Sequence, residues 1–274
     1  MPFVCLVGMQ PMPLNQEDAV MPEDTIIDAL KRNDANALRV CARAGPGTAA
    51  AIAGEIDQLE PDARFLAVDC LALMTTGEGG RALLEVTDSE DPMVAKEAAD
   101  ALSRHPGVNP GEILKAIPRR DDPFVRGRLY QVVGNSRNSA LAWALGELVG
   151  AEDDEDAERN GRAALAKLGD KQERERLLRR LENADADEAI ELTEDLVYVG
   201  DPRLALGLLP WLDRKDDVFR QGSDRQPERM IRMCDLAVWT AHSIGVSMSH
   251  PPAAIDIYDE STIADARYAI QRLR

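Results

Sequence analysis

Two stretches of sequence, DPMVAKEAADALS from Asp91 and DPFVRGRLYQVVG from Asp122, decide the fold of this chain. Both begin with Asp-Pro and then carry apolar residues at steps of 0, +4, +7 and +8, which trace one face of an α-helix. These residues are Val94, Ala98, Ala101 and Leu102, then Val125, Leu129, Val132 and Val133. Asp is a favourable N-cap, and Pro suits the first turn because the N–H that it lacks has no partner there. The two stretches therefore predict equivalent amphipathic helices.

The same frame fits three more segments loosely, so that the pattern recurs along the chain. Its first positions are residues 65, 94, 125, 157 and 190, separated by 29, 31, 32 and 33 residues. A leucine-rich segment lies in each interval and after the last frame position, at residues 80–87, 111–117, 139–149, 172–181 and 201–212. Two helices per period indicate stacked helical pairs, because one pair cannot bury its apolar faces alone.

We therefore expect an all-α fold, an α-solenoid of about six or seven helical hairpins. Residues 35–44 and 48–59 predict another helical pair upstream. Residues 230–244 predict the first helix of a final pair. No stretch predicts a strand. In this interpretation residues 1–22 are a flexible N-terminal tail, although translation starting at Met21 is an open alternative. Residues 23–274 form one domain, with a long loop near 213–227 and a divergent C-terminal cap.

The motif Asp122-Pro123-x-Val125-Arg126, followed by small apolar positions, resembles the HEAT repeat, including its bacterial HEAT-like form. The resemblance covers roughly residues 34–244, and the complete motif occurs once, since Ala95 follows Val94. It implies a curved surface that binds another protein. Bacterial HEAT-like proteins include immunity proteins that neutralise a toxin, sometimes a basic nuclease, and that function is one expectation for this chain.

Composition restricts the partner. The 274 residues contain 32 Lys and Arg against 49 Asp and Glu, a formal charge of −17. That charge argues against binding nucleic acid or an anionic membrane and favours a basic protein partner. No run of about eighteen apolar residues occurs, so we expect no membrane partner and a cytoplasmic location. Four cysteines without a CxxC pair predict neither a disulfide framework nor a zinc site, and we expect Cys41, Cys70 and Cys234 to be buried.

Motifs for catalysis are missing from the sequence. His105, His242 and His250 lie far apart, and there is no GxSxG, GxxxxGK[ST] or strand-linked GxGxxG motif. We therefore expect a non-enzyme without cofactor or metal that binds its partner through a concave surface. Two alternatives stay open: a HEAT-like enzyme or enzyme accessory acting on nucleic acid or a chromophore, and an adaptor subunit of a larger assembly.

Candidate contact residues follow if the second helices line the concave surface. Arg176 and Arg179 then project away from the leucine stripe of their helix, as a partner-binding patch or as a solvated face with pairs such as Glu175–Arg179. Trp143 either anchors a partner or packs on the neighbouring repeat. The predicted partner-binding residues of the concave face and the long loop are Arg119, Arg120, Trp143, Glu147, Arg176, Arg179, Arg214, Asp216, Asp217 and Phe219.

Overall fold

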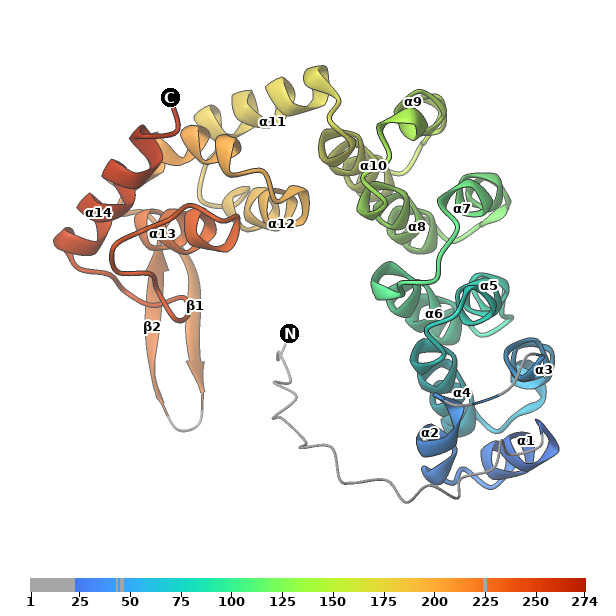
Figure 1. Ribbon diagram of the computed structural model, residues 1–274. Coiled ribbons are helices and arrows are strands. Elements are labelled where there is room, and N and C mark those ends of the chain that lie inside the picture. The colour runs from blue at the N-terminus through green and yellow to red at the C-terminus, as the bar shows by residue number, and fades with distance from the viewer. Residues whose placement is uncertain (1–22, 43, 45–46, 224–225) are drawn as a thin grey trace.

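The computed structural model describes residues 23–42, 44, 47–223 and 226–274, and these residues are mainly helical, as predicted. Helical pairs follow one another along an arc of two layers (Figure 1). The inner layer contains α4 (Pro61–Leu73), α6 (Pro92–Arg104), α8 (Pro123–Asn135), α10 (Glu155–Leu168), α12 (Ala189–Val199) and α13 (Met233–Ser243). The outer layer contains α3 (Thr48–Glu55), α5 (Gly77–Val86), α7 (Pro110–Ala116), α9 (Ala142–Gly150) and α11 (Lys171–Asn183).

Further elements complete the two ends and the connections. Helices α1 (Glu23–Lys31) and α2 (Asn36–Cys41) lie at one end of the arc, and α14 (Glu260–Gln271) lies at the other (Figure 1). The 3-10 helices are the short η1 (Ile56–Gln58), η2 (Ile117–Arg119) and η3 (Ser139–Leu141) and the longer η4 (Pro202–Asp213). Residues 201–212 were predicted as a second helix, and η4 fills this place, packed against α11, α13 and α14. Pro210 lies inside η4, where it cannot donate a backbone hydrogen bond.

The predicted caps are present. Asp91 and Asp122 are the N-caps of α6 and α8, and their carboxylates accept hydrogen bonds from Met93 N at 3.0 Å and Phe124 N at 2.8 Å. Asp154 caps α10 in the same way. The acidic residues before these inner helices therefore satisfy backbone N–H groups that a helix start leaves unpaired.

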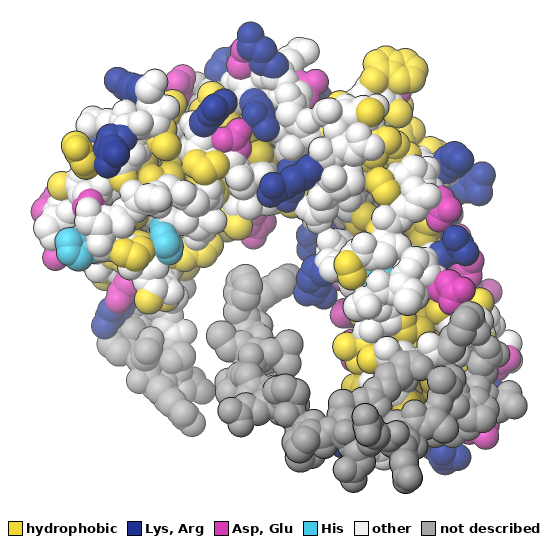
Figure 2. Space-filling view, in the orientation of Figure 1, with side chains coloured by type: hydrophobic (Ala, Val, Ile, Leu, Met, Phe, Trp, Pro, Cys, Tyr) yellow, Lys and Arg dark blue, Asp and Glu magenta, His cyan; other side chains and the backbone are white. Residues whose placement is uncertain are grey.

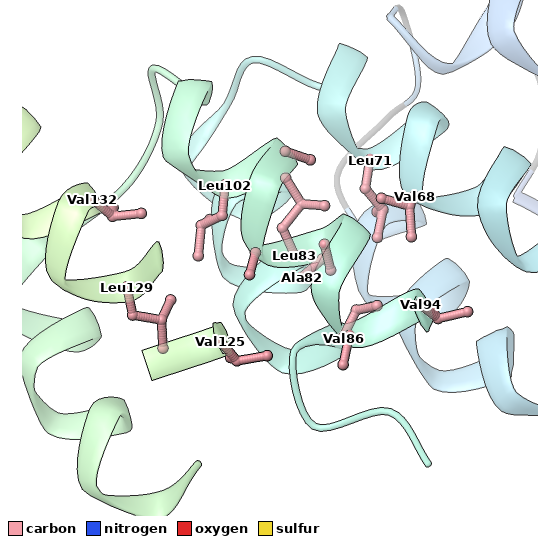
Figure 3. Packing of buried hydrophobic residues seen from close by; sticks show 14 of the residues in the cluster. Val68, Leu71, Ala82, Leu83, Val86, Val94, Leu102, Val125, Leu129 and Val132 are labelled. Carbon is pink, nitrogen blue, oxygen red and sulfur yellow. The ribbon is translucent and has the colours of Figure 1, made fainter. Parts of the chain in front are cut away.

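Burial corrects the repeat frame at two positions. Val94, Val125 and Ala157 are buried as predicted, whereas Phe65 is 37% and Ile190 is 41% exposed. The buried residues in their place are Ala63 and Ala189, so the frame positions 63, 94, 125, 157 and 189 are spaced by 31, 31, 32 and 32 residues. Small alanines hold the buried positions there, and apolarity alone favoured their larger neighbours. Figure 3 shows the resulting core, in which buried side chains of α4, α5, α6 and α8 point toward one another.

Ion pairs connect successive helical pairs. Arg64 on α4 lies 3.3 Å from Asp91 before α6, and Arg174 on α11 lies 3.0 Å from Asp201 before η4. Arg126, the arginine of the motif at Asp122, donates to Glu152 from α8 across to the loop before α10. These contacts fix the register between neighbouring pairs because each joins an arginine to a carboxylate that precedes a helix of the next pair.

Glycines let the inner helices approach one another closely. A Cβ on Gly134 of α8 would overlap the Tyr198 hydroxyl and lie 2.9 Å from the Cα of Ala164 on α10. A Cβ on Gly127 would lie 2.8 Å from the Asn160 amide on α10. Close approach on the inner side, with the outer helices α7, α9 and α11 spread apart (Figure 1), bends the stack into an arc. The concave side therefore belongs to the first helix of each pair.

The prediction of a long loop near 213–227 is wrong for the residues that the structure describes there. Strands β1 (Asp217–Ser223) and β2 (Gln226–Arg232) pair there as an antiparallel hairpin, with Phe219 opposite Ile231. Helix α13 accordingly begins at Met233, after the hairpin. Alternation is weak in this segment because charged or other polar residues occupy most positions, yet Ile231 is fully buried and anchors β2 against the core. An isolated two-stranded hairpin has marginal stability in water. Burial of Ile231 against the helices therefore stabilises this one.

Several predictions concern the chain as a whole. Cys41, Cys70 and Cys234 are free and buried, as expected. The predicted tail, residues 1–22 with Cys5, lies outside the described residues. Among the helices that the structure describes, none combines the length and apolarity needed to cross a bilayer.

Candidate functional site

A groove with a volume of about 880 Å³ lies on the inner side of the arc. We name it the inner groove; its walls come from α6, α8, α10, α12, α13, β1 and the segment before α14. Figure 2 shows the molecule curved around this hollow side. The lining residues are Lys96, Asp122, Pro123, Phe124, Arg128, Gln131, Asp154, Asp156, Ala157, Arg159, Asn160, Ile190, Thr193, Glu194, Val197, Tyr198, Phe219, Leu236, Trp239 and Ile255.

Large apolar side chains are exposed in this groove. Phe124 on α8 and Val197 on α12 are each 38% exposed, and Ile190 at the start of α12 is 41% exposed. Half-buried Phe219 and Trp239 reach the groove from β1 and α13. Apolar residues that separate elements bring to one concave surface are typical of a protein-binding or ligand-binding site.

Cations flank Phe124. Lys96 Nζ lies 5.4 Å and the Arg128 guanidinium 5.1 Å from the centre of its ring, within the range of cation–π attraction. Lys96 also pairs with Asp122 at 3.3 Å, and Arg128 with Asp100 at 2.6 Å. This part of the groove therefore offers an aromatic ring next to two positive charges, one on α6 and one on α8.

Tyr198 fixes the position of α12 relative to α8. Its hydroxyl donates to the backbone oxygen of Gln131 at 2.7 Å, and Lys167 Nζ lies 4.1 Å from the centre of its ring. Burial raises the pKa of Tyr198 and lowers the pKa of Lys167 to about 8, with Arg137 adding to the second effect. The wall of the groove therefore rests on buried contacts rather than on surface loops.

A second cavity of about 430 Å³ lies between α10, α11 and α12, and Arg159 lines both cavities. Asp195 lies at its base, with Arg159 at 3.7 Å and Arg180 at 3.8 Å. Burial raises the pKa of Asp195 to about 6, and the two arginines oppose that rise. Seven carboxylates and four arginines line this cavity, so the positive charges of the arginines are more than balanced within the chain.

The prediction that second helices line the concave surface is wrong. Trp143 and Glu147 lie on α9, and Arg176 and Arg179 on α11, both in the outer layer (Figure 1). Trp143 is 78% exposed, and the surface over α9 is hydrophobic in Figure 2. Arg176 reaches the second cavity, and Arg119 is exposed after α7. The physical reason is the close packing of the first helices, which glycines of α8 allow against α10, and which places these helices on the inside of the curve.

Arg120 is a structural residue. Its guanidinium is buried, donates to Thr87 Oγ1 at 2.8 Å and Leu84 O at 3.0 Å, and pairs with Asp88 at 2.6 Å. These contacts tie the end of α7 to the end of α5. Because its guanidinium is buried and already bound by these groups, Arg120 does not belong to the contact surface for which it was predicted.

The predicted loop residues divide between two roles. Arg214 donates to Asp216 at 2.7 Å and to the backbone oxygen of Ala184, which anchors the base of the hairpin. Asp217 is exposed at the start of β1. Phe219 lines the inner groove, and among the predicted contact residues it alone does so within the described part of the chain.

Sequence reasoning missed Phe124, Ile190, Val197 and Trp239 as groove residues. Phe124 directly precedes Val125 and Ile190 directly follows Ala189, so each is a large apolar residue next to a buried frame position. A large apolar residue next to a buried frame position could therefore have indicated a groove residue. This inference requires the correct frame positions. Trp239, which is half-buried on α13, also contributes to the groove.

His105 has a structural role, because both of its ring nitrogens contact the backbone. His105 Nε2 lies 2.8 Å from Met74 O, and its Nδ1 accepts from Gly107 N at 3.1 Å. Within residues 23–42, 44, 47–223 and 226–274, no cluster of three or more His, Cys, Asp or Glu side chains is placed to hold a metal ion.

No protein-family model matches this chain, and no curated protein matches it in sequence.

Proposed function

We propose that this protein is a HEAT-like α-solenoid that acts as a non-catalytic scaffold and binds a partner protein in the inner groove. One observation carries the proposal: Phe124, Ile190 and Val197 are exposed together on the concave side, next to half-buried Phe219 and Trp239. Covering such residues with a partner removes apolar surface from water, which is favourable.

The rigidity of the groove supports the same function. Its apolar residues lie on packed helices and one anchored hairpin, so little conformational entropy is lost when a partner binds. Tyr198 and its hydrogen bond to Gln131 O hold α12 in place before any partner arrives. A preformed concave surface of this kind suits a segment of another protein that presents apolar side chains.

We propose a basic partner, because the charge of −17 attracts cations over a long range. Exposed carboxylates at the groove, such as Asp156, would then meet the positive charges of that partner. A cationic toxin neutralised by an immunity protein is the narrower form of this proposal. It predicts a tight complex in which the toxin loses its activity.

Site-specific photo-crosslinking in the native cell tests the proposal. A benzophenone amino acid replaces Phe124 or Val197 in the groove, and Trp143 on the outer layer serves as the matched control. We expect one protein to be crosslinked from both groove positions and not from position 143. Crosslinking from position 143 alone would contradict the groove as the binding surface.

The purified partner then allows a quantitative measurement. Val197→Asp places a charge among apolar residues and should weaken binding about tenfold or more. Leu73→Asp is the control, because Leu73 is 44% exposed on α4 and lies outside the groove. Equal affinities of the two variants would argue against the proposal, as would retention of DNA at physiological salt.

A further inference from the structure

The inner groove and the part of the chain before α1 have matching chemistry. Residues 3–9, with the sequence FVCLVGM, form an uninterrupted apolar run. Residues 1–22 contain two charged side chains, Glu17 and Asp18, both acidic. The groove exposes large apolar side chains, and its α6 and α8 side carries Lys96 and Arg128.

We propose that residues 3–9 bind in the inner groove of the same molecule, as an internal occupant that an incoming partner must displace. The inference concerns the groove and this segment alone, so it can stand or fall independently of the partner proposed above. It assigns the apolar run to a binding role.

The chain is long enough for this contact. Thirteen residues lie between Met9 and Glu23, the first residue of α1, so fourteen steps along the chain span up to about 46 Å at roughly 3.3 Å per step. Helix α1 packs on α4, α4 on α6 and α6 on α8, so three interhelical steps lead from α1 to the groove. At about 10 Å per step the distance is about 30 Å. The run therefore reaches Phe124 and the residues beyond it.

Charge favours the same path. A chain that leads from α1 to the groove passes the α6 and α8 side first, where Lys96 and Arg128 lie close to the Phe124 ring. Glu17 and Asp18 lie between the apolar run and α1. Opposite charges along the approach attract each other, and the apolar run then meets Val197 and Trp239.

Cys5 provides an internal probe, since it lies within the apolar run and the described cysteines are buried. We would introduce Val197→Cys in the full chain and oxidise it with copper phenanthroline. Peptide mass spectrometry should find a disulfide between Cys5 and the introduced thiol within one molecule. Leu73→Cys is the matched control, because its exposed position on α4 lies outside the groove.

The two variants distinguish the outcomes. At least about tenfold more intramolecular disulfide in the 197 variant than in the 73 variant supports the proposal. Equal yields would overturn it, because they indicate random collisions of the segment. Disulfide-linked dimers from the 197 variant would also overturn it, since the groove would then take this segment from a second copy.

A binding measurement closes the test without any partner protein. The probe is a peptide of residues 1–20 with Cys5→Ser, titrated against the chain that begins at Met21. We expect saturable binding, about tenfold weaker to the full chain, whose own segment competes, and about tenfold weaker to the Val197→Asp variant. Leu73→Asp should bind like the parent. Absence of binding, or equal binding to all four proteins, would refute the inference.

Discussion

Glu152 shows how a single residue can join two helical pairs. Its carboxylate is 3% exposed and accepts hydrogen bonds from Arg126 at 2.6 Å and Tyr130 at 2.9 Å. Burial alone would raise the pKa of Glu152, but the hydrogen bonds from Arg126 and Tyr130 outweigh it and hold the pKa below its usual value. Glu152 is therefore ionised at neutral pH and compensates the charge of Arg126.

We predict that Glu152→Gln lowers the free energy of unfolding by about 3 kcal/mol at pH 7, because the variant leaves the Arg126 charge without its partner. Since the folded pKa is lowered, this contribution is present above the unfolded pKa and is lost as the pH falls through the folded pKa. Urea unfolding at several pH values measures it. Glu147→Gln, at an exposed site on α9, should change stability by less than about 0.5 kcal/mol; equal midpoints for both variants would refute the prediction.

Asp195 shows the opposite behaviour, because burial raises its pKa to about 6 despite Arg159 and Arg180. Between the ordinary value of 3.8 and 6, the folded state binds more protons than the unfolded state. The stability contribution of this residue therefore falls as the pH rises through 6. At neutral pH its ionised form is a cost to the fold.

We accordingly predict that Asp195→Asn raises the free energy of unfolding at pH 7.5, by about 1 to 3 kcal/mol. The gain should shrink when the measurement is repeated near pH 4.5, where the wild-type carboxyl is protonated. Chemical denaturation at the two pH values decides the matter. A variant that is less stable at pH 7.5 would mean that the ion pairs with Arg159 and Arg180 outweigh the cost of burial.

At the scale of elements, the approach of α8 to α10 and α12 depends on Gly134. A Cβ at this position would meet the Ala164 backbone, which can move only with α10, and the Tyr198 hydroxyl, which can move only by giving up its hydrogen bond to Gln131 O. Overpacking of this kind typically costs about 1 to 3 kcal/mol. The curvature of the arc and the wall of the inner groove both depend on this contact.

Gly134→Ala should therefore lower the thermal midpoint and weaken ligand binding in the groove. Gly146→Ala is the matched control on α9, where a Cβ would meet no atom within 4 Å. There alanine should raise the free energy of unfolding by about 0.5 to 1 kcal/mol, since it favours the helix. Differential scanning calorimetry of both variants measures the effect, and a shift of the same sign in both would contradict the close-packing argument.

At the scale of the whole molecule, helical pairs contact mainly their neighbours, so stability is distributed along the chain. The pair formed by α1 and α2 lies at one end of the arc, whereas α8 packs on both α6 and α10. We predict that amide hydrogen exchange is fastest in α1 to α3 and slowest in α8 and α10. Mass spectrometry after timed exchange measures this gradient, and equal protection of α2 and α8 would contradict it.

The net charge acts at the same scale. With a charge of −17, association with a basic partner should slow about tenfold or more between 50 and 500 mM NaCl, because salt screens long-range attraction. Dissociation should change much less, since the apolar contacts in the groove are insensitive to salt. Stopped-flow mixing with the purified partner, once crosslinking has identified it, provides both rates. A salt-independent association rate would rule out electrostatic steering.

Sequence reasoning predicted the helical pairs, their period and their caps, because these features depend on local spacing. Asp-Pro followed by apolar steps of +4, +7 and +8 defines α6 and α8 through short-range geometry alone. The burial of Cys41, Cys70 and Cys234 was also predicted, because each lies in an apolar helical stretch. The partner-binding residues were predicted less well, since Phe219 was found in the groove while Phe124, Ile190 and Val197 were missed.

Only the tertiary structure decided which layer lies inside the arc. That choice depends on how closely neighbouring helices approach, which Gly127, Gly134 and Tyr198 determine across different elements. The hairpin of β1 and β2 likewise requires the core that buries Ile231. Local pattern specifies which face of a helix is apolar, whereas the side on which a stack of helices bends is a property of contacts between residues far apart in the chain.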